Sequence, residues 1–402
     1  MSAAKLPAWL SILLVCLLFL GLLGGFTLGL HSLLGQNPPG ADFFTFWVAG
    51  RALFTQGQDP YSAEVTLASQ QGIYGRAALP EEDQVAYAYP PYALLPLLPV
   101  AFMPYSWAQA FWMAFNILLL LTVAFFSLPK APRWLVISFL FFYPVAFGVL
   151  LGNFAVLIGA ILIGVYCFVI DKDNPKPWVL FLAGFLLAWT TAKPQFMWLF
   201  LLFIGIYVLR YKRWWLVAGG AAGMLVMLGL SWLLVPNWLN EWITRIQEYA
   251  GYVQSQPTLM NFLLISAERS AALKATIITA VGCLIFTFWL MRAWWKKEIP
   301  SLQVLIWFGF VTYLFHPHGI SYEQMCFLAP LLIWAGQPPR KTIAAYLAFW
   351  WVPLIISWVA FVISKWVFNP ADEWPLIYFC VFVLWVFTRR TEKKEKELHA
   401  DT

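Results

Sequence analysis

The chain has 402 residues, of which 62% are hydrophobic and only 11% are charged. A soluble globular protein is about one quarter charged and less than half apolar, so this composition excludes a cytosolic enzyme, a disordered chain and a fibrous repeat. The formal net charge of +6 would suit nucleic-acid binding. However, the Lys and Arg residues lie in short loops between apolar runs, as the positive-inside rule predicts for membrane proteins, so no nucleic-acid partner is expected.

Apolar runs of membrane-spanning length follow one another along the whole sequence. The first, residues 6–30, is too long for a signal-peptide core and follows Lys5, so we expect a retained span with a cytoplasmic N-terminus. Eleven further runs bring the expected total to about twelve transmembrane helices in an all-α integral membrane protein. They cover roughly residues 105–128, 133–151, 153–170, 177–192, 194–210, 213–236, 272–294, 300–316, 322–337, 341–365 and 374–388.

The basic residues predict how the chain is oriented. With the N-terminus inside, 18 of the 25 Lys and Arg residues fall on the cytoplasmic side. The other seven lie outside or near the outer ends of spans: Arg51, Arg76, Lys193, Arg245, Arg269, Lys274 and Lys365. This asymmetry predicts that both termini are cytoplasmic. We expect one multi-pass membrane domain over residues 1–388 and a charged cytoplasmic tail over residues 389–402. The sequence carries no targeting motif that we recognise, which suits a prokaryotic plasma membrane.

Two predicted outer segments, residues 35–90 and 237–271, are too long to be simple connections, and long loops tend to carry function. In the first, DFFTFWVAGRALFTQ predicts an interfacial helix with these residues on one face: Phe43, Phe46, Trp47, Gly50 and Phe54. The proline-rich AYPPYALLPLLPVAFMP that follows is too short to span with ease and predicts a re-entrant or interfacial segment. In the second, NWLNEWITRIQEY predicts another interfacial helix, with Trp238 and Trp242 four residues apart.

Uncommon polar residues near the membrane all fall on the outer side of this topology. Ionisable groups there are costly and favour a functional role. The candidates are Asp42, Asn153, Lys193, His316, His318 and Glu323. Each also has a purely structural interpretation: Asp42 as a helix N-cap, Asn153 as a turn residue, Lys193 as a side chain reaching the head groups, and the histidines as interfacial hydrogen-bonding residues.

Metal and disulfide chemistry find little support in the sequence. The five Cys residues show no C-x-x-C spacing and are best interpreted as small apolar side chains in helices. His316, His318 and Glu323 are metal-ligand types, but the spacing H-x-H-x4-E matches no established motif. We therefore expect no metal.

In order along the chain, these segments resemble glycosyltransferase family 87. GADFFTFWVAGRALFTQGQDPYS is similar to the family's opening motif, an Asp before an aromatic-rich helix and then Gly-x-Asp-x-Tyr, here Asp42, Gly57, Asp59 and Tyr61. AYPPYALLPLLPVAFMP resembles its Tyr-Pro-Pro segment, and LLGNFAVLIGAIL resembles its Leu-Gly-Gln-x-Asn turn. AGFLLAWTTAKPQFMWLFLLFIGIYVLRYKRWW resembles its glycine-rich helix with Lys-Pro and a basic turn.

The resemblance extends from about residue 40 to residue 335 and departs from the family pattern at four places. Asn153 stands where Gln is usual, and PTLMNFL lacks the Ser expected after Asn261. FHPHGISYEQMCFLAPLL resembles the family's Ser-Pro-x-x-x-x-Tyr-Asp segment, with His316 in place of Ser and Glu323 in place of Asp. These departures leave mannose, arabinose and glucose open as the donor sugar.

The resemblance implies a C-type glycosyltransferase fold and a polyprenyl-phosphate sugar, most often mannose, as donor. By resemblance Asp42 is the catalytic base, and we expect Lys193 to bind the donor phosphate. His316 or His318 would hydrogen-bond the phosphate or the sugar. Asn153, Glu323, Tyr61 and Arg51 are further candidates for substrate binding, although Arg51 could instead support the loop. No cofactor is expected besides this lipid-linked co-substrate.

The expected chemistry fits this inventory. A lipid phosphosugar leaves as a phosphate monoester with a second pKa of about 6, so it needs no strong general acid. One carboxylate that accepts the proton of the acceptor hydroxyl then suffices, whereas a glycoside hydrolase needs two. Attack in line with the leaving phosphate predicts inversion. The sequence shows no Asp-x-Asp and no glycine-rich phosphate loop, which disfavours a nucleotide-sugar donor.

Two other functions stay open. A transporter or flippase of a lipid-linked or small polar solute would carry out no covalent chemistry and would place polar residues at mid-membrane depth. Such residues are few here, which favours the enzyme. An inactive family member that acts as an assembly partner is the third interpretation. The acceptor could be a glycolipid, a polysaccharide or a protein, and the lipid bilayer is the expected surroundings.

Overall fold

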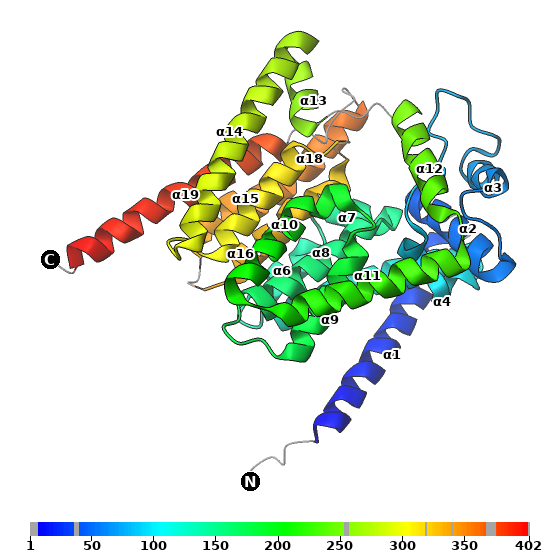
Figure 1. The fold of residues 1–402 in the computed structure, drawn as a ribbon, viewed down its shortest axis with the longest axis horizontal. Helices are drawn as coiled ribbons and strands as arrows, with labels where there is room; N and C mark the ends of the chain where they lie inside the picture. Colours follow the sequence, from blue (N-terminus) through cyan, green and yellow to red (C-terminus); the bar gives the residue numbers. More distant parts are fainter. Residues whose placement is uncertain are drawn as a thin grey trace. The chain divides into compact units, whose positions relative to one another are not determined.

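We analysed a computed structural model of the chain, which describes residues 7–35, 40–252, 257–317, 320–338, 341–366 and 375–400. These residues form helices and loops and include no β-strand (Figure 1). The five cysteines are free thiols. The all-α prediction is therefore confirmed for the part of the chain that the structure describes.

The helices follow one another with short connections. Their bounds are α1 (Ala8–Leu34), α2 (Ala41–Gln56), α3 (Ala63–Tyr74), η1 (Pro91–Leu97), α4 (Leu98–Ala101), α5 (Tyr105–Ser127), α6 (Arg133–Phe139), α7 (Tyr143–Leu151), α8 (Phe154–Val165), η2 (Tyr166–Ile170), α9 (Pro177–Thr190), α10 (Pro194–Tyr211), α11 (Trp214–Leu234), α12 (Trp238–Tyr252), α13 (Thr258–Leu264), α14 (Arg269–Trp295), α15 (Ser301–Leu314), η3 (Ser321–Gln324), α16 (Met325–Gly336), α17 (Ile343–Tyr346), η4 (Leu347–Trp351), α18 (Val352–Trp366) and α19 (Pro375–Ala400).

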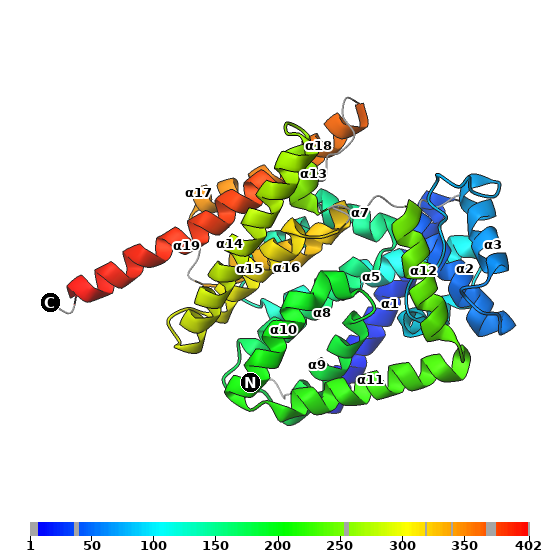
Figure 2. The same ribbon diagram turned by 45° about the horizontal axis from the view of Figure 1, so that its top comes forward.

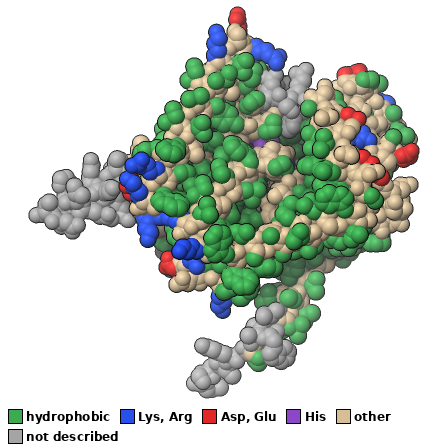
Figure 3. Space-filling model, viewed as in Figure 1, with side chains coloured by type: hydrophobic (Ala, Val, Ile, Leu, Met, Phe, Trp, Pro, Cys, Tyr) green, Lys and Arg blue, Asp and Glu red, His purple; other side chains and the backbone are tan. Residues whose placement is uncertain are grey.

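Six helices in the described residues are long and apolar enough to cross a membrane, and a seventh span results if the bent pair α6 and α7 forms one, with 55° between its halves. The six cover Leu13–Leu34, Tyr105–Ser127, Pro194–Tyr211, Trp214–Leu234, Arg269–Trp295 and Ile343–Ile363. Hydrophobic side chains predominate over the face that Figure 3 shows. A multi-pass membrane protein is thus supported. Each predicted span overlaps helix in the described residues, but the run 133–151 is broken into α6 and α7 and several other helices are short. The count of twelve therefore stays a prediction.

The chain divides into two compact units, neither of them continuous in sequence. The first comprises Met1–Thr122, Val149–Leu157 and Ser231–Tyr252, and the second comprises Val123–Gly148, Ile158–Leu230 and Val253–Thr402. The predicted limits of the membrane domain and of the cytoplasmic tail stay predictions, although the backbone of α19 is helical as far as Ala400.

In the first unit, α2 packs its aromatic face against protein. Phe43 and Phe46 are buried. The ring of Phe43 stacks on Trp112 of α5 at a centroid distance of 5.8 Å, and that of Phe46 stacks on Phe154 of α8 at 4.4 Å. The predicted helix is confirmed. Of the residues expected to line its interfacial face, Phe43, Phe46 and Gly50 are buried in this unit, and Trp47 and Phe54 are half-buried.

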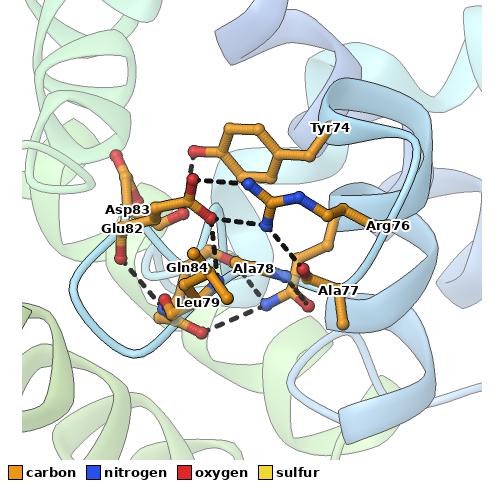
Figure 4. A network of polar contacts seen from close by, with 9 residues as sticks. Tyr74, Arg76, Ala77, Ala78, Leu79, Glu82, Asp83 and Gln84 are labelled. Carbon is orange, nitrogen blue, oxygen red and sulfur yellow. Dashed lines mark hydrogen bonds and ion pairs between the residues drawn. The ribbon is translucent and has the colours of Figure 1, made fainter.

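The segment between α3 and η1 has little regular structure and is held by polar contacts (Figure 4). Arg76 forms an ion pair with Glu82, with 2.7 Å between Nη2 and Oε1, and the backbone N–H of Leu79 donates to the same carboxylate at 2.8 Å. These hydrogen bonds, that of Arg76 first, lower the pKa of Glu82 to about 2. Gln70 on α3 donates to the backbone carbonyl of Gln84 at 3.1 Å. This part of the long outer loop is therefore ordered by its own side chains.

In the second unit, α15 and α16 form the most deeply buried helix pair and lie side by side in Figures 1 and 2. All residues of α16 are buried. Gly309 allows the close approach, because a Cβ atom there would lie 2.4 Å from the carbonyl oxygen of Cys326. Gly184 on α9 and Gly219 on α11 serve another close crossing, since a Cβ on either would lie within about 2 Å of a backbone oxygen of the other helix.

Candidate functional site

Asp42 lies in the first turn of α2 and is half-buried. Gly40 is the N-cap of this helix, so Asp42 does not serve as the cap. Instead, the side-chain N–H of Asn153 donates to Oδ2 of Asp42 at 2.8 Å. The other end of the same amide, Oδ1, accepts from the backbone N–H of Ala155 at 2.9 Å in the first turn of α8. These two bonds fix the orientation of the Asn153 amide and, through it, that of the carboxylate.

The turn before α8 brings Asn153 to Asp42. Gly152 has a φ of 71°, a left-handed conformation that favours glycine, and a Cβ atom there would lie 2.6 Å from that of Phe43 on α2. Its carbonyl accepts from the indole N–H of Trp112 at 2.9 Å. Residues 42 and 153, which are 111 positions apart in sequence, therefore meet because a glycine turn lets α2 approach closely.

Arg51 and Tyr61, the other candidates in the first unit, hold the outer segment together. Arg51 lies over the ring of Trp47 at 5.4 Å and has Nη1 3.5 Å from the carbonyl of Met103. The Tyr61 hydroxyl donates to the carbonyl of Tyr89 at 2.6 Å, and burial raises its pKa well above the ordinary value. These contacts favour a supporting role for both side chains.

In the second unit, three predicted site residues come together. Lys193 forms an ion pair with Oε1 of Glu323, and Nε2 of His316 lies 3.3 Å from the other oxygen, Oε2. The imidazole of His316 is thus within ion-pair distance of the carboxylate. All three side chains are at most 3% exposed. Lys193 thus does not extend to the head groups but is enclosed by protein.

Helix ends position this cluster, which we call the Lys193 cluster (Lys193, His316 and Glu323, with Tyr322). Lys193 directly precedes α10, whose first residue is Pro194. His316 follows α15, and its carbonyl accepts from the backbone N–H of Thr258 at 3.1 Å. Glu323 lies in the 3-10 turn η3 ahead of α16. The three residues thus flank the ends of three different helices, and their side chains meet there.

Tyr322 is a contact that the sequence analysis did not select. The Lys193 ammonium lies 4.8 Å from the centroid of its ring. A buried ammonium needs an anion and electron-rich neighbours to offset its lost hydration, and Glu323 and Tyr322 supply both. The only available signal was its position beside Glu323, at the tyrosine of the pattern quoted above.

A second missed feature is a carboxyl pair in the first unit. Glu241 on α12 lies near Asp59 of the outer segment. Partial burial, and then the hydrogen bond and charge of Asp59, raise the pKa of Glu241 to about 7, while Arg245 acts in the opposite direction. Asp59 also accepts from the backbone N–H of Tyr61 at 2.9 Å.

Two predictions lie beyond what the structure describes. His318 lies outside the described residues. Among the residues described, no group of three or more His, Cys, Asp and Glu side chains could hold a metal ion. The absence of a metal from the reaction stays a prediction, as does the placement of the candidate residues on the outer side of the membrane.

The long apolar helices indicate a multi-pass membrane protein, and few charged side chains are buried among the described residues. The sequence model of glycosyltransferase family 87 matches residues 87–317, more than half of the chain. The chain belongs to this family and is therefore a membrane glycosyltransferase. No curated protein and no solved structure matches it. The family match confirms the resemblance predicted above and includes Asn153, Lys193 and His316.

Proposed function

We propose that the protein transfers a sugar, mannose in view of the resemblance, from a polyprenyl-phosphate donor to an acceptor hydroxyl. The reaction takes place on the outer face of a plasma membrane and inverts the anomeric configuration. Membership of glycosyltransferase family 87 supports the transfer of a glycosyl group. The donor, the outer face and the inversion come from the sequence-based argument.

The observation that carries the mechanism is the hydrogen bond from Asn153 to Asp42. A catalytic base must present its carboxylate in a fixed orientation and stay accessible to the acceptor. Asp42 is only half-buried, and one of its oxygens is held by an amide that is itself anchored on α8. Asp42 is thus suited to be the base, and Asn153 acts through it as a positioning residue.

In the transfer step, the acceptor oxygen attacks the anomeric carbon of the donor sugar while its proton moves to Asp42. The bond between that carbon and the phosphate oxygen breaks, and the electron pair leaves with the polyprenyl phosphate. Because the nucleophile and the phosphate lie on opposite faces of the sugar, a β-linked donor gives an α-linked product.

Lys193 is the cation for the donor phosphate in this proposal. Its charge is already matched by Glu323 before the donor binds, so the donor phosphate would share the Lys193 ammonium with the Glu323 carboxylate. Glu323 is then the internal counter-ion of Lys193 rather than a ligand of the sugar. His316, which contacts the same carboxylate, or His318 supplies a hydrogen bond to the phosphate.

The proposal includes the C-type fold with about twelve spans and cytoplasmic termini. The helices at all twelve predicted positions and the location of the candidate residues near helix ends agree with it. The acceptor is a glycolipid, a polysaccharide or a protein with a free hydroxyl.

The test is sugar transfer by purified protein in lipid nanodiscs, with synthetic polyprenyl-phosphate mannose, arabinose and glucose and a mixed lipid extract as acceptor. We expect a mannosylated product, reduced at least ~10²-fold in Asp42→Asn because general base catalysis is lost. Asp83→Asn, in the outer loop, is the matched control. Undiminished transfer by Asp42→Asn would contradict the mechanism. Folded protein that uses no donor would move the assignment to transport or to an inactive family member.

A further inference from the structure

The helix α12 presents three faces of different character. One face packs against the first outer segment: Trp238 is buried, the Trp242 indole donates to the carbonyl of Ala88 at 3.1 Å, and Arg245 donates to that of Tyr61. A second face is polar and exposed, with Asn240, Thr244 and Gln247. The third is apolar and exposed, with Leu239, Ile243 and Ile246.

The apolar residues form one continuous stripe. At about 100° per residue, positions 239, 243 and 246 lie within about 60° of one another around the helix. Leu239 is 39% exposed, Ile243 44% and Ile246 42%. The two tryptophans predicted to mark the interfacial face point into the protein instead, so this exposed stripe has no aromatic member. If this surface faced water, the three apolar side chains would form an exposed hydrophobic patch.

The chain before α12 indicates what covers the stripe. The last residues of α11 are also exposed and apolar: Trp232 at 47%, Leu233 at 80% and Leu234 at 41%. They end the candidate span Trp214–Leu234. A tight turn closed by hydrogen bonds from Val235 to Ser231 and from Trp238 to Val235 separates the two helices. The stripe therefore begins five residues after the exposed apolar end of a candidate membrane span.

The charges on α12 bear on which kind of surface covers its apolar stripe. Its exposed polar face carries no Lys or Arg, because Arg245 is directed to Tyr61 and to Glu248. Attraction to anionic head groups is therefore not what holds the helix at a bilayer, and burial of apolar side chains has to do so. The occupant that fits is the acyl boundary of a bilayer, irrespective of the charge of its lipids.

We propose that α12 is a membrane-surface helix. It lays Leu239, Ile243 and Ile246 into the lipid at the end of α11, and its opposite face holds the loop that contains Asp59, Tyr61 and Ala88. The helix thereby sets the height of this loop above the bilayer. The proposal does not depend on which reaction the protein catalyses.

The test measures the depth of single labels on α12. Cys16 and Cys380 are replaced by Ser and Ala, since the other three native cysteines are buried. A cysteine at Ile243 or Ile246 carries an environment-sensitive fluorophore, and matched variants carry it at Thr244 or Gln247. The protein is placed in nanodiscs of phosphatidylcholine, alone or with brominated acyl chains. Variants that elute as the parent protein does in gel filtration are compared.

Bromine should reduce the fluorescence at positions 243 and 246 by about twofold and leave positions 244 and 247 nearly unchanged, because only the stripe reaches the acyl chains. Adding phosphatidylserine should not alter the difference. Equal quenching at positions 243 and 247 would overturn the proposal. So would protection of position 243 that depends on two protein copies per disc and not on bromine, since a second chain would then cover the stripe.

Discussion

Single and double substitutions at the ion pair between Lys193 and Glu323 can distinguish an effect on stability from an effect on activity. Both side chains are at most 3% exposed, so the small energies of surface ion pairs do not apply. Replacing Lys193 by Met leaves a buried carboxylate, and replacing Glu323 by Leu leaves a buried ammonium. Either change should destabilise the protein by about 3–5 kcal/mol.

The double variant removes both charges at once. An apolar pair of similar volume is often as stable as the ion pair it replaces, so most of the lost stability should return. The assay is the apparent melting temperature in detergent, measured as the loss of the monodisperse gel-filtration peak. Lys274→Met, at an exposed position on α14, is the control and should match the wild type.

Activity should follow a different order. If Lys193 binds the donor phosphate, the double variant stays inactive although it is folded, and a raised donor concentration does not restore it. A double variant no more stable than the single ones would refute the compensating pair. A double variant that is both stable and active would refute the role of Lys193 at the phosphate.

Three further predictions concern the first unit. Gly152→Ala should lower both stability and transfer, by more than about 1 kcal/mol in the melting assay, because it needs a left-handed φ and forces a Cβ against α2; a variant as stable as the wild type would contradict this. Glu241 holds its proton up to about pH 7 in the fold but only to about 4.5 when unfolded, so its pairing with Asp59 should contribute less as the pH rises from 4.5 to 7. The melting temperature of the wild type should fall over that range more than that of Glu241→Gln, and parallel curves would argue against the pair. The pKa of Glu82 is lowered to about 2, so the contribution of its bond to Arg76 should vanish as the pH falls from 4.5 to 2, and Arg76→Ala should make the loop sensitive to protease already at neutral pH; equal cleavage of both proteins would contradict this.

The positions of the helices could be predicted from the sequence because long apolar runs have few alternatives to helix in a membrane. The predicted run 105–128, for example, agrees with α5 to within one residue. The packing of the faces could not be predicted in the same way. The aromatic residues of α2 and the tryptophans of α12 form amphipathic patterns, which fit a lipid interface and a protein interior equally well. In the structure, Phe43, Phe46 and Trp238 are buried and Trp242 bonds to the backbone of Ala88.

The site was predictable in kind but not in its pairs. Topology placed Asp42 and Asn153 on one predicted side, yet their hydrogen bond depends on the φ of Gly152 and on how closely α2 approaches, neither of which a spacing encodes. The proximity of Asp59 and Glu241 is equally hidden, because both residues read as ordinary loop and helix-surface carboxylates until α12 packs on the loop.

Lys193 shows how a buried charge could have led further. An ammonium enclosed in an apolar unit must have an anion nearby, since its desolvation costs several kcal/mol. The chain has only 19 Asp and Glu residues, and few of them lie next to predicted spans. Glu323 is one of these and was selected on the same predicted side as Lys193. Two such residues, each too costly to bury alone, compensate each other's charge before either meets a substrate. The charge that the donor phosphate encounters is then that of the pair, which is why Glu323 should be tested together with Lys193 and not as an independent ligand.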